Sequence, residues 1–217
     1  MLARVVGGLG AAAAALLGWG WFEAGWVRLR TLDVQVPGLP QELDGLRVTH
    51  LSDFHLGVPS GSARAVESAV AWVEERRPDL VLVTGDLLTH PRGEPRLRQL
   101  LERLGPATYA VLGNHDFGDA RDPLAAPSRL DDLSPAHLLR DDSVELVLAG
   151  HLHDGQIAIP YGRGKMRLAH FDWRYTKGLY RRDGSVLHVS PGLGTTFVPF
   201  RFFARPEATE LVLRRAT

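Results

Sequence analysis

Four short polar clusters contain the residues of this sequence that are best suited to metal chemistry. The clusters are Asp53-Phe54-His55, Gly85-Asp86, Gly113-Asn114-His115-Asp116 and Gly150-His151-Leu152-His153. They supply carboxylate, amide and imidazole groups, and no thiolate is available because the 217-residue chain contains no cysteine. This mixed set suits Mn²⁺, Fe²⁺/Fe³⁺, Zn²⁺ or Ni²⁺ better than Ca²⁺, which prefers oxygen ligands alone. The lack of cysteine also excludes a disulfide scaffold, a thiolate zinc site and a cysteine nucleophile.

Such ligands can serve hydrolysis when one carboxylate is shared by two ions. The shared carboxylate holds the ions about 3.5–4 Å apart, so that one orients a hydroxide while both neutralise a phosphoryl group. A histidine that does not bind metal can then protonate the leaving alkoxide. Taken singly, an Asp after a strand is usually a turn former. The prediction of a site therefore depends on the four clusters meeting in space.

Each cluster follows a predicted strand. Short, largely apolar runs predict strands at 46–51, 79–84, 108–112 and 144–149. Helices are predicted at 62–77, with Ser62 as the N-cap, and at 96–104. Ligands bind beyond the carboxyl ends of strands in open α/β sheets, so the four clusters are expected to converge there.

The rest of the chain after residue 30 is expected to be mostly β. Residues 34–46 contain Pro and Gly and predict one edge strand and a turn. Further strands are predicted at 157–160, 186–190 and 209–213. The alternation of strands and helices, followed by strands, predicts an α/β fold with a layered sheet core.

Composition limits the classes of protein to consider. The chain has 25 basic and 25 acidic residues, with 45% apolar and 23% charged residues, which excludes a disordered, collagen-like or polytopic membrane protein. Residues 31–160 hold 11 basic and 20 acidic residues, and 161–217 hold 11 basic and 4 acidic residues. The acidic part suits cations, whereas the basic part suits phosphate-bearing ligands or an anionic membrane surface; an unevenly charged, solvated surface is the alternative. No basic stripe with interleaved aromatic residues is present, so no nucleic-acid partner is expected.

The N-terminus predicts a single-pass membrane anchor. Residues 5–22 carry no charge over 18 positions, and interfacial aromatic residues follow at Trp19, Trp21 and Trp26. A cleaved signal peptide is the alternative, but the best cleavage site places Phe22 where a small residue is needed. We therefore expect an anchor at 1–30 and one domain at 31–217. The flanking charges do not define the side of the membrane, and the pattern carries no signal for an oligomeric state.

The ordered motifs DxH, GD, GNHD and GHxH resemble those of the calcineurin-like metallophosphoesterase superfamily. The segments LDGLRVTHLSDFHLG, HDGQIAIP, PGLGTTFVPFR and RPEATELVL are similar to its bacterial membrane-associated or Tat-exported branch. The resemblance covers Leu46 to Leu213. It implies a layered β-sandwich of two mixed sheets flanked by helices, with the site at their edge.

The resemblance also implies a role for each residue. Asp53, His55 and His153 would bind a first metal, and Asp86 would bridge two ions. A second metal would be held by Asn114 and His151, and His115 would face the leaving group. Members of the superfamily hydrolyse phosphomonoesters, phosphodiesters or pyrophosphates, and some cleave UDP-diacylglucosamine.

Four features depart from the family pattern or add to it. A His-x-Pro motif is expected between GNHD and GHxH, but this stretch is short and has Leu133 where that histidine would stand, so the fold is expected to be shortened in its middle. His137, predicted at a helix start, is the one histidine available as a substitute ligand. Asp154 stands where relatives usually carry Gly and is expected to add negative charge beside the metals. Arg201 is a candidate clamp for a phosphate or a headgroup, because a guanidinium binds phosphate oxygens bidentately; an arginine paired with surface carboxylates is the alternative.

The leading prediction is therefore a membrane-anchored, metal-dependent phosphoesterase with one or two divalent ions (Mn, Fe, Zn or Ni) per chain. Its expected partner is a phosphorylated small molecule or a lipid-linked substrate such as UDP-diacylglucosamine. The alternative is a catalytically impaired relative that binds metal but lacks a complete second metal site, which the missing histidine favours.

Overall fold

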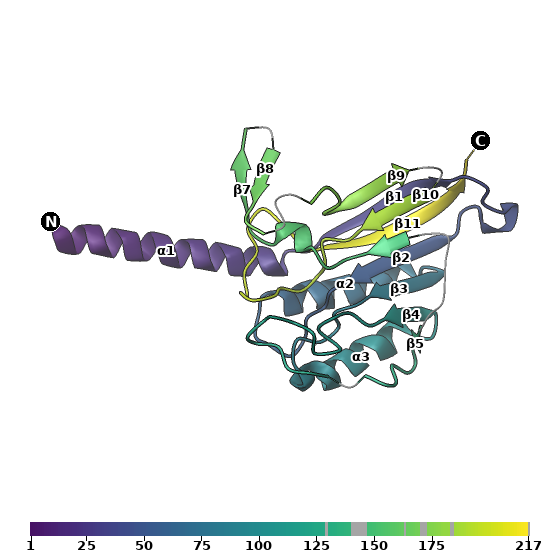
Figure 1. The fold of residues 1–217 in the computed structure, drawn as a ribbon, viewed down its shortest axis with the longest axis horizontal. Coiled ribbons are helices and arrows are strands. Elements are labelled where there is room, and N and C mark those ends of the chain that lie inside the picture. The colour runs from purple at the N-terminus through teal and green to yellow at the C-terminus, as the bar shows by residue number, and fades with distance from the viewer. Residues whose placement is uncertain (129, 140–146, 163, 170–172, 183–184, 217) are drawn as a thin grey trace.

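A computed structural model describes the whole chain except residues 129, 140–146, 163, 170–172, 183–184 and 217 (Figure 1). Its largest sheet contains Arg28–Val36 (β1), Arg47–Ser52 (β2), Leu80–Thr84 (β3), Thr108–Val111 (β4), His137–Leu138 (β5) and Glu207–Arg215 (β11). The strand order is β1-β11-β2-β3-β4-β5. The four strands from β2 to β5 are parallel, and β11 runs antiparallel to β2 and parallel to β1.

A second, three-stranded sheet packs on one face of this sheet. It contains Val147–Ala149 (β6), Gly178–Arg182 (β9) and Ser185–Val189 (β10), with β10 parallel to β6 and antiparallel to β9. Val48, Leu211 and Val186 are buried between the two sheets. A separate hairpin of Ala158–Tyr161 (β7) and Gly164–Arg167 (β8) projects from the body near the end of the N-terminal helix (Figure 1).

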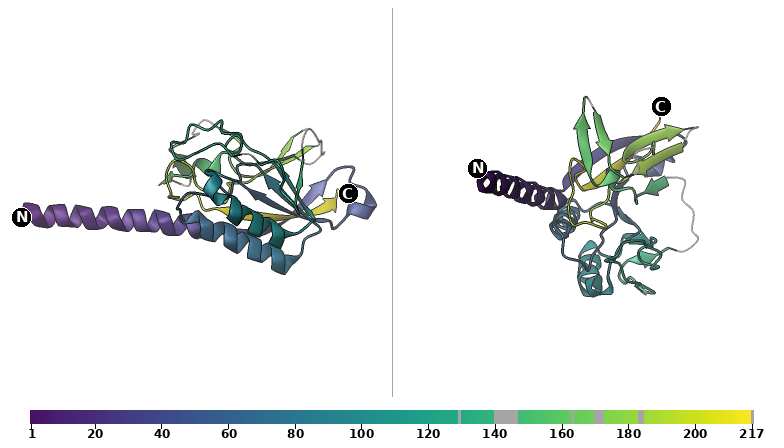
Figure 2. Two further views of the ribbon diagram at one scale, coloured as in Figure 1. Left: turned by 90° about the horizontal axis from the view of Figure 1, so that it is seen from below. Right: turned by 60° about the vertical axis from the view of Figure 1, so that its left-hand side comes forward.

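Two helices cover the other face of the large sheet (Figure 2). They are Ser62–Arg76 (α2) and Glu94–Leu104 (α3), and their apolar residues recur at helical spacing and are buried against the strands. α2 ends at Arg77, which adopts a left-handed conformation with φ of 47°. Short 3₁₀ turns occur at Gln41–Leu43 (η1), Pro91–Gly93 (η2) and His153–Gly155 (η3).

The N-terminal helix, Leu2–Gly25 (α1), extends away from the body (Figures 1 and 2). Only its last turns pack on the domain, where Gly20, Glu23 and Ala24 are buried. A side chain at Gly20 would overlap the ring of Phe202, so this close approach requires glycine. Within the described residues, Arg4–Gly25 is the one helix long and apolar enough to cross a membrane, as judged by length and composition.

The predicted fold class is confirmed: the structure is a mixed α/β fold with mixed sheets flanked by helices, and most predicted elements appear within two residues of their expected bounds. Three local predictions are wrong. The edge strand expected within 34–46 begins earlier, because β1 covers Arg28–Val36. Gly61, not Ser62, occupies the N-cap of α2. His137 lies in β5 rather than at a helix start, because its backbone pairs with Tyr109 of β4. Residues 144–146 of the fourth predicted strand lie outside the described part of the chain.

Candidate metal centre

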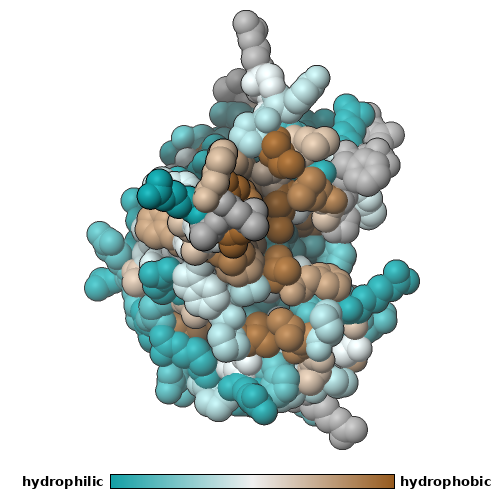
Figure 3. All heavy atoms as spheres, turned by 90° about the vertical axis from the view of Figure 1, so that its left-hand side faces the viewer, coloured by the Kyte–Doolittle hydropathy of each residue, from teal (hydrophilic) through white to brown (hydrophobic). Residues whose placement is uncertain are grey.

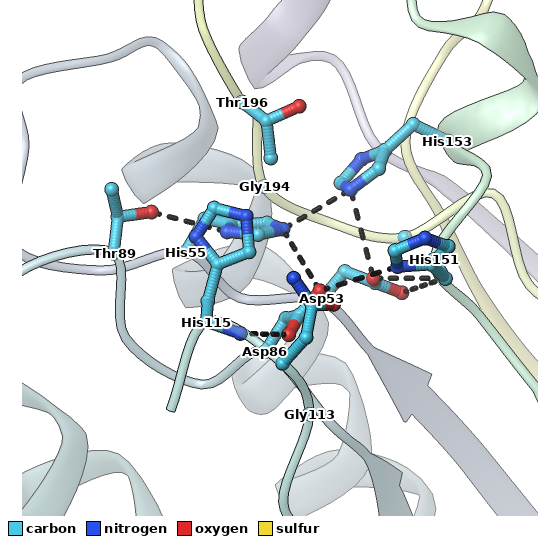
Figure 4. Close-up of polar contacts among 12 residues, drawn as sticks. Asp53, His55, Asp86, Thr89, Gly113, His115, His151, His153, Gly194 and Thr196 are labelled. Atoms are coloured by element: carbon cyan, nitrogen blue, oxygen red, sulfur yellow. Dashed lines mark hydrogen bonds and ion pairs between the residues drawn. The ribbon is translucent and has the colours of Figure 1, made fainter. Parts of the chain in front are cut away.

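The four polar clusters meet at the carboxyl ends of β2, β3, β4 and β6 (Figure 4). Asp53 and His55 follow β2, Asp86 follows β3, and His153 follows β6, which belongs to the other sheet. All four are buried, with at most 5% of each residue exposed. The sandwich of two sheets therefore brings together residues that are up to 100 positions apart in the sequence.

Three donor atoms, from Asp53, His55 and His153, lie close enough together to share one ion, and a carboxylate oxygen of Asp86 borders this group. His55 Nε2 is 3.1 Å from His153 Nε2, and His153 Nε2 is 3.6 Å from Asp53 Oδ1. Asp86 Oδ2 lies 3.8 Å from His55 Nε2. Two ligand atoms that each lie about 2.1 Å from one cation are about 3.0 Å apart in an octahedron and about 3.4 Å apart in a tetrahedron. The observed separations match or slightly exceed these values, so the donor set fits a divalent ion.

Asp86 also lies near a second histidine. His151 Nδ1 is 3.8 Å from Asp86 Oδ2, which places this carboxylate between His55 and His151 (Figure 4). The His151 side chain is 61% exposed, unlike the buried ligands of the first group. The amide nitrogen of Asn114, in the loop after β4, donates to the Asp119 carbonyl at 3.1 Å.

His115 is buried beside the donors. Its ring packs edge-on against that of His55, with a centroid distance of 4.5 Å, and its main-chain N–H donates to Asp86 Oδ1 at 3.0 Å. His55, Asp86 and His115 each offer an atom within 4.8 Å of the others. The buried Nδ1 atom of His115 has no hydrogen-bond partner among the described residues.

His137 does not belong to either of the two candidate ligand groups found among the described residues. It is exposed on β5, where its ring stacks on Tyr109 at 4.9 Å.

The backbone is strained at the predicted ligands. Asp53, His55, Asp86, His151 and His153 all have positive φ, between 49° and 79°. This conformation costs non-glycine residues about 1–3 kcal/mol each, and it concentrates at functional sites. Its recurrence at five predicted ligands is a structural sign of function that is independent of their chemistry.

Glycines before the ligands permit the close approach of the loops. A Cβ at Gly113 would collide with the Asp86 carboxylate, and a Cβ at Gly150 would collide with that of Asp53. Only glycine can occupy these positions while the carboxylates keep their places. The lack of space for a Cβ atom thus explains why glycine begins both the GNHD and the GHxH motif.

Burial is the main cause of the pKa shifts at this cluster. Burial, followed by repulsion from Asp86, raises the pKa of the Asp53 carboxyl to about 7. Burial also lowers the pKa of His55 to about 3 and holds that of His153 well below its usual value. Burial acts to raise the pKa of Asp86, but the nearby His151 and His55 outweigh it and lower that pKa. Neutral imidazoles beside carboxylates are the form that a divalent ion binds, and its charge would favour ionised Asp53.

Two residues to which the sequence assigned no role, Thr89 and the last residue of the GNHD motif, Asp116, hold the site in place. Thr89 Oγ1 lies 3.1 Å from His55 Nδ1, which orients that ring. Asp116 accepts hydrogen bonds from the main-chain N–H groups of Leu87, Leu88 and Gly113, at 2.9–3.1 Å. Asp116 thereby ties the loop after β3 to the loop after β4. For Thr89 no signal in the sequence suggests this role.

A buried chain of hydrogen bonds links Asp53 to both sheets. Ser52 Oγ donates to Asp53, and Thr84 Oγ1 donates to Ser52 Oγ at 2.9 Å. His50 Nε2 lies 2.8 Å from Thr84 Oγ1, and His50 Nδ1 lies 2.8 Å from His188 Nδ1 of β10. The position of Asp53 therefore depends on contacts across the interface between the sheets.

Arg201 is not a phosphate clamp, and that prediction is wrong. Its side chain is fully buried and donates to the carbonyl oxygens of Gly194, Ala204 and Pro191. Its Nη2 atom lies 2.9 Å from His153 Nδ1. The guanidinium is therefore a buried support for the loop behind His153, and no substrate can reach it.

Asp154 does not place its charge beside the metal ligands, contrary to expectation. Its left-handed backbone (φ 52°) turns the carboxylate into a buried cluster of cations. Lys165 pairs with one carboxylate oxygen, as does Lys177 at 3.0 Å, and Arg167 Nε lies 3.0 Å from the other. These ion pairs lower the pKa of Asp154 against the effect of its burial.

Comparison with known proteins agrees with this geometry. The family model of the calcineurin-like phosphoesterases matches residues 46–135, which include three of the four clusters. The metallophosphoesterase YkuE of Bacillus subtilis is 27% identical over 237 aligned positions, covering 81% of this chain and 82% of that protein. The alignment is longer than the 217 residues of this chain, so YkuE carries segments that this chain lacks.

Two other relatives have informative names. A "transmembrane protein with metallophosphoesterase domain" of Danio rerio is 28% identical, covering 86% of this chain, which spans only 58% of that protein. The UDP-2,3-diacylglucosamine pyrophosphatase LpxG of Chlamydia muridarum is 31% identical over 48% of this chain and 34% of its own length. Residues 46–135 of this chain therefore match the calcineurin-like phosphoesterases, and the chain is a metal-dependent phosphoester hydrolase.

Proposed function

We propose that this chain is a membrane-anchored phosphoesterase whose tightly bound ion is held by Asp53, His55, Asp86 and His153. The observation that carries this proposal is the convergence of two imidazole nitrogens and two carboxylate oxygens, separated by 3.1, 3.6 and 3.8 Å, in a buried site. Asp86, Asn114 and His151 would hold a second ion. The exposure of His151 favours weaker binding of that ion.

The roles of the protein groups follow from their positions. A divalent ion bound here would polarise the phosphoryl oxygens and lower the pKa of a water. Asp86 lies between the two groups of ligands, so its negative charge would stabilise both ions. His115, buried beside His55, would give its proton to the leaving alkoxide.

The native ion is proposed to be Mn, Fe, Zn or Ni. Two histidines and two carboxylates supply mixed nitrogen and oxygen donors, which Ca²⁺ and Mg²⁺ rarely choose. Elemental analysis of the purified full chain tests this, and Ca or Mg as the retained ion would contradict it.

We further propose that residues 1–30 anchor the enzyme in a membrane and that residues 31–217 form its catalytic domain. The long, exposed and apolar α1 supports the anchor. Carbonate extraction of membranes tests it, because an anchored chain stays in the pellet whereas a chain with a cleaved leader is released.

The substrate is proposed to be a lipid-linked phosphoester, such as a nucleotide-lipid of the UDP-diacylglucosamine type. A pocket of about 490 Å³ adjoins His151 and is lined partly by Trp173, Arg174 and Tyr175. Aromatic rings and a guanidinium can hold a base or a phosphate next to the metal centre. Arg174→Ala is expected to raise the KM for such a substrate, with little change in the KM for a small aryl phosphate.

Hydrolysis of an aryl phosphodiester and an aryl phosphomonoester, with and without Mn²⁺, tests the reaction. We expect metal-dependent turnover that His115→Gln removes. His137→Gln is the matched control, because this histidine lies on β5 outside the ligand groups of the described residues.

An impaired metal-binding relative is the second candidate, favoured by the exposed and incomplete second set of ligands. One retained ion with no turnover on either ester at any Mn²⁺ concentration would support that reading and contradict the first.

A further inference from the structure

A pocket separate from the metal centre lies where α1 joins the domain. Its volume is about 500 Å³, and it is lined by Trp19 and Trp26 from the end of α1, by Phe203, and by the β7–β8 hairpin through Pro160 and Lys165. Tryptophan is enriched at membrane–water interfaces. If α1 spans a bilayer, this pocket therefore lies at the level of the lipid headgroups.

The pocket wall has an excess of positive charge. Arg28, Lys165, Lys177 and Arg205 all line it. Lys165 and Lys177 share the single carboxylate of the buried Asp154, which a third cation also contacts. One negative charge thus serves three positive ones, two of which, Lys165 and Lys177, line the pocket.

The acidic residue of the wall, Glu23, is already used for structure. Its Oε1 accepts the main-chain N–H of Ala204 at 3.0 Å, and its Oε2 accepts the indole N–H of Trp19 at 3.1 Å. The guanidinium of Arg205 lies flat over the Trp26 ring, 3.6 Å from its centre, and donates to the Trp26 carbonyl. Arg205 is therefore a cation held in place at the pocket wall.

Exposed apolar residues border the pocket on the face from which α1 emerges. Figure 3 looks along α1 from its N-terminal end, and the apolar side chains across the middle of this view include those of α1 itself. Ile159 and Met166 form an exposed cross-strand pair on the hairpin. Phe197 and Phe203 are exposed, although their positive φ values (58° and 52°) are strained for aromatic residues. Burial in lipid would compensate for this exposure and strain.

We propose that this pocket binds the phosphate headgroup of an anionic phospholipid from the leaflet around the C-terminal end of α1. The proposal rests on the membrane anchor proposed above. Arg205, Lys165 and Lys177 would contact the phosphate, and the acyl chains would follow the apolar surface of α1. Burial lowers the pKa of Lys165, and a phosphate would offset this cost of desolvation. A zwitterionic headgroup fits less well, because its ammonium would meet the positive surplus.

Tryptophan fluorescence in lipid vesicles tests this inference. The full chain is reconstituted in phosphatidylcholine containing a fraction of brominated phosphatidylcholine or brominated phosphatidylglycerol, because bromine quenches only nearby indoles such as Trp19 and Trp26. We expect brominated phosphatidylglycerol to occupy the site beside these indoles in preference to brominated phosphatidylcholine by a factor of about ten. Lys177→Gln combined with Arg205→Gln should reduce this preference to near unity. Arg92→Gln combined with Arg96→Gln, which removes the same charge from surface positions at η2 and α3, should leave it unchanged.

The outcomes separate this inference from the proposal on which it rests. Equal quenching by both brominated lipids in the wild-type chain would overturn the headgroup site while leaving the anchor intact. Absence of quenching by either lipid would contradict the anchor itself. Loss of the preference on addition of millimolar glycerol phosphate would show that the pocket takes soluble phosphate esters, which would also overturn the lipid site. A thermal unfolding curve for each variant shows that its fold is retained.

Discussion

Replacing Arg201 with Met distinguishes a buried support from a substrate clamp. The guanidinium donates to Gly194 O from Nε (3.0 Å) and Nη2 (2.7 Å), to Ala204 O from Nη1 (2.8 Å) and to Pro191 O from Nη2 (2.9 Å). These three carbonyls lose their donors in Arg201→Met, and the Gly192 carbonyl, which lies 3.3 Å from Nη2, loses one of its two donors. An unpaired buried acceptor costs about 1–3 kcal/mol, so the three carbonyls left unpaired, at about 2 kcal/mol each, together cost about 6 kcal/mol.

Part of this loss is recovered, because the variant no longer buries a charge. Burial lowers the pKa of Arg201 from its usual range to about 10, which corresponds to about 3 kcal/mol. The expected net loss in the free energy of unfolding is therefore about 3 kcal/mol. Since domains of this size are typically stable by about 5–15 kcal/mol, the variant should still fold.

Urea unfolding of the full chain in detergent measures this loss. Arg214→Met is the matched control, because it removes an exposed arginine paired with Asp33 and should cost less than about 0.5 kcal/mol. The KM of folded Arg201→Met for an aryl phosphodiester should equal that of the wild type, because no substrate reaches the buried guanidinium. An unchanged free energy of unfolding together with a raised KM would refute this reasoning and restore the clamp.

Three further predictions concern the metal centre. His115→Gln should lower kcat about 10²–10⁴-fold with an unchanged metal content, and loss of metal from this variant would make His115 a ligand instead. Asp86→Asn should lower the occupancy of both ions, whereas Asn114→Ala should lower only that of the more weakly bound ion. Elemental analysis that finds the full metal content in Asp86→Asn would contradict the shared carboxylate. Because the pKa of Asp53 is raised to about 7, its proton competes with the ion below that pH. The affinity for the tight ion, measured by calorimetry, should therefore fall about tenfold per pH unit as the pH is lowered below 7 and level off above it. His55, with a pKa of about 3, adds no competition in this range.

Much of the fold was predictable because its signals are local. Short apolar runs such as 79–84 predict buried strands from residue type alone, and β3 occupies 80–84. The helical spacing of Ala65, Val66 and Val73 similarly predicts α2, in which these residues are buried. Short strands lack such a signal: β5 has two residues and depends on pairing with β4, so sequence reasoning placed His137 in a helix.

The sequence by itself determined which residues could bind metal, because the types and order of the four clusters are local properties of the chain. The tertiary structure decided how charged residues near them are used. Arg201 and Asp154 both looked like groups that act in the site, yet the fold buries both, one against main-chain carbonyls and the other against three cations. Thr89 became a support of His55 only because their loops meet in space. The environment of a charged or polar side chain is set by partners distant in sequence, and no local pattern encodes it.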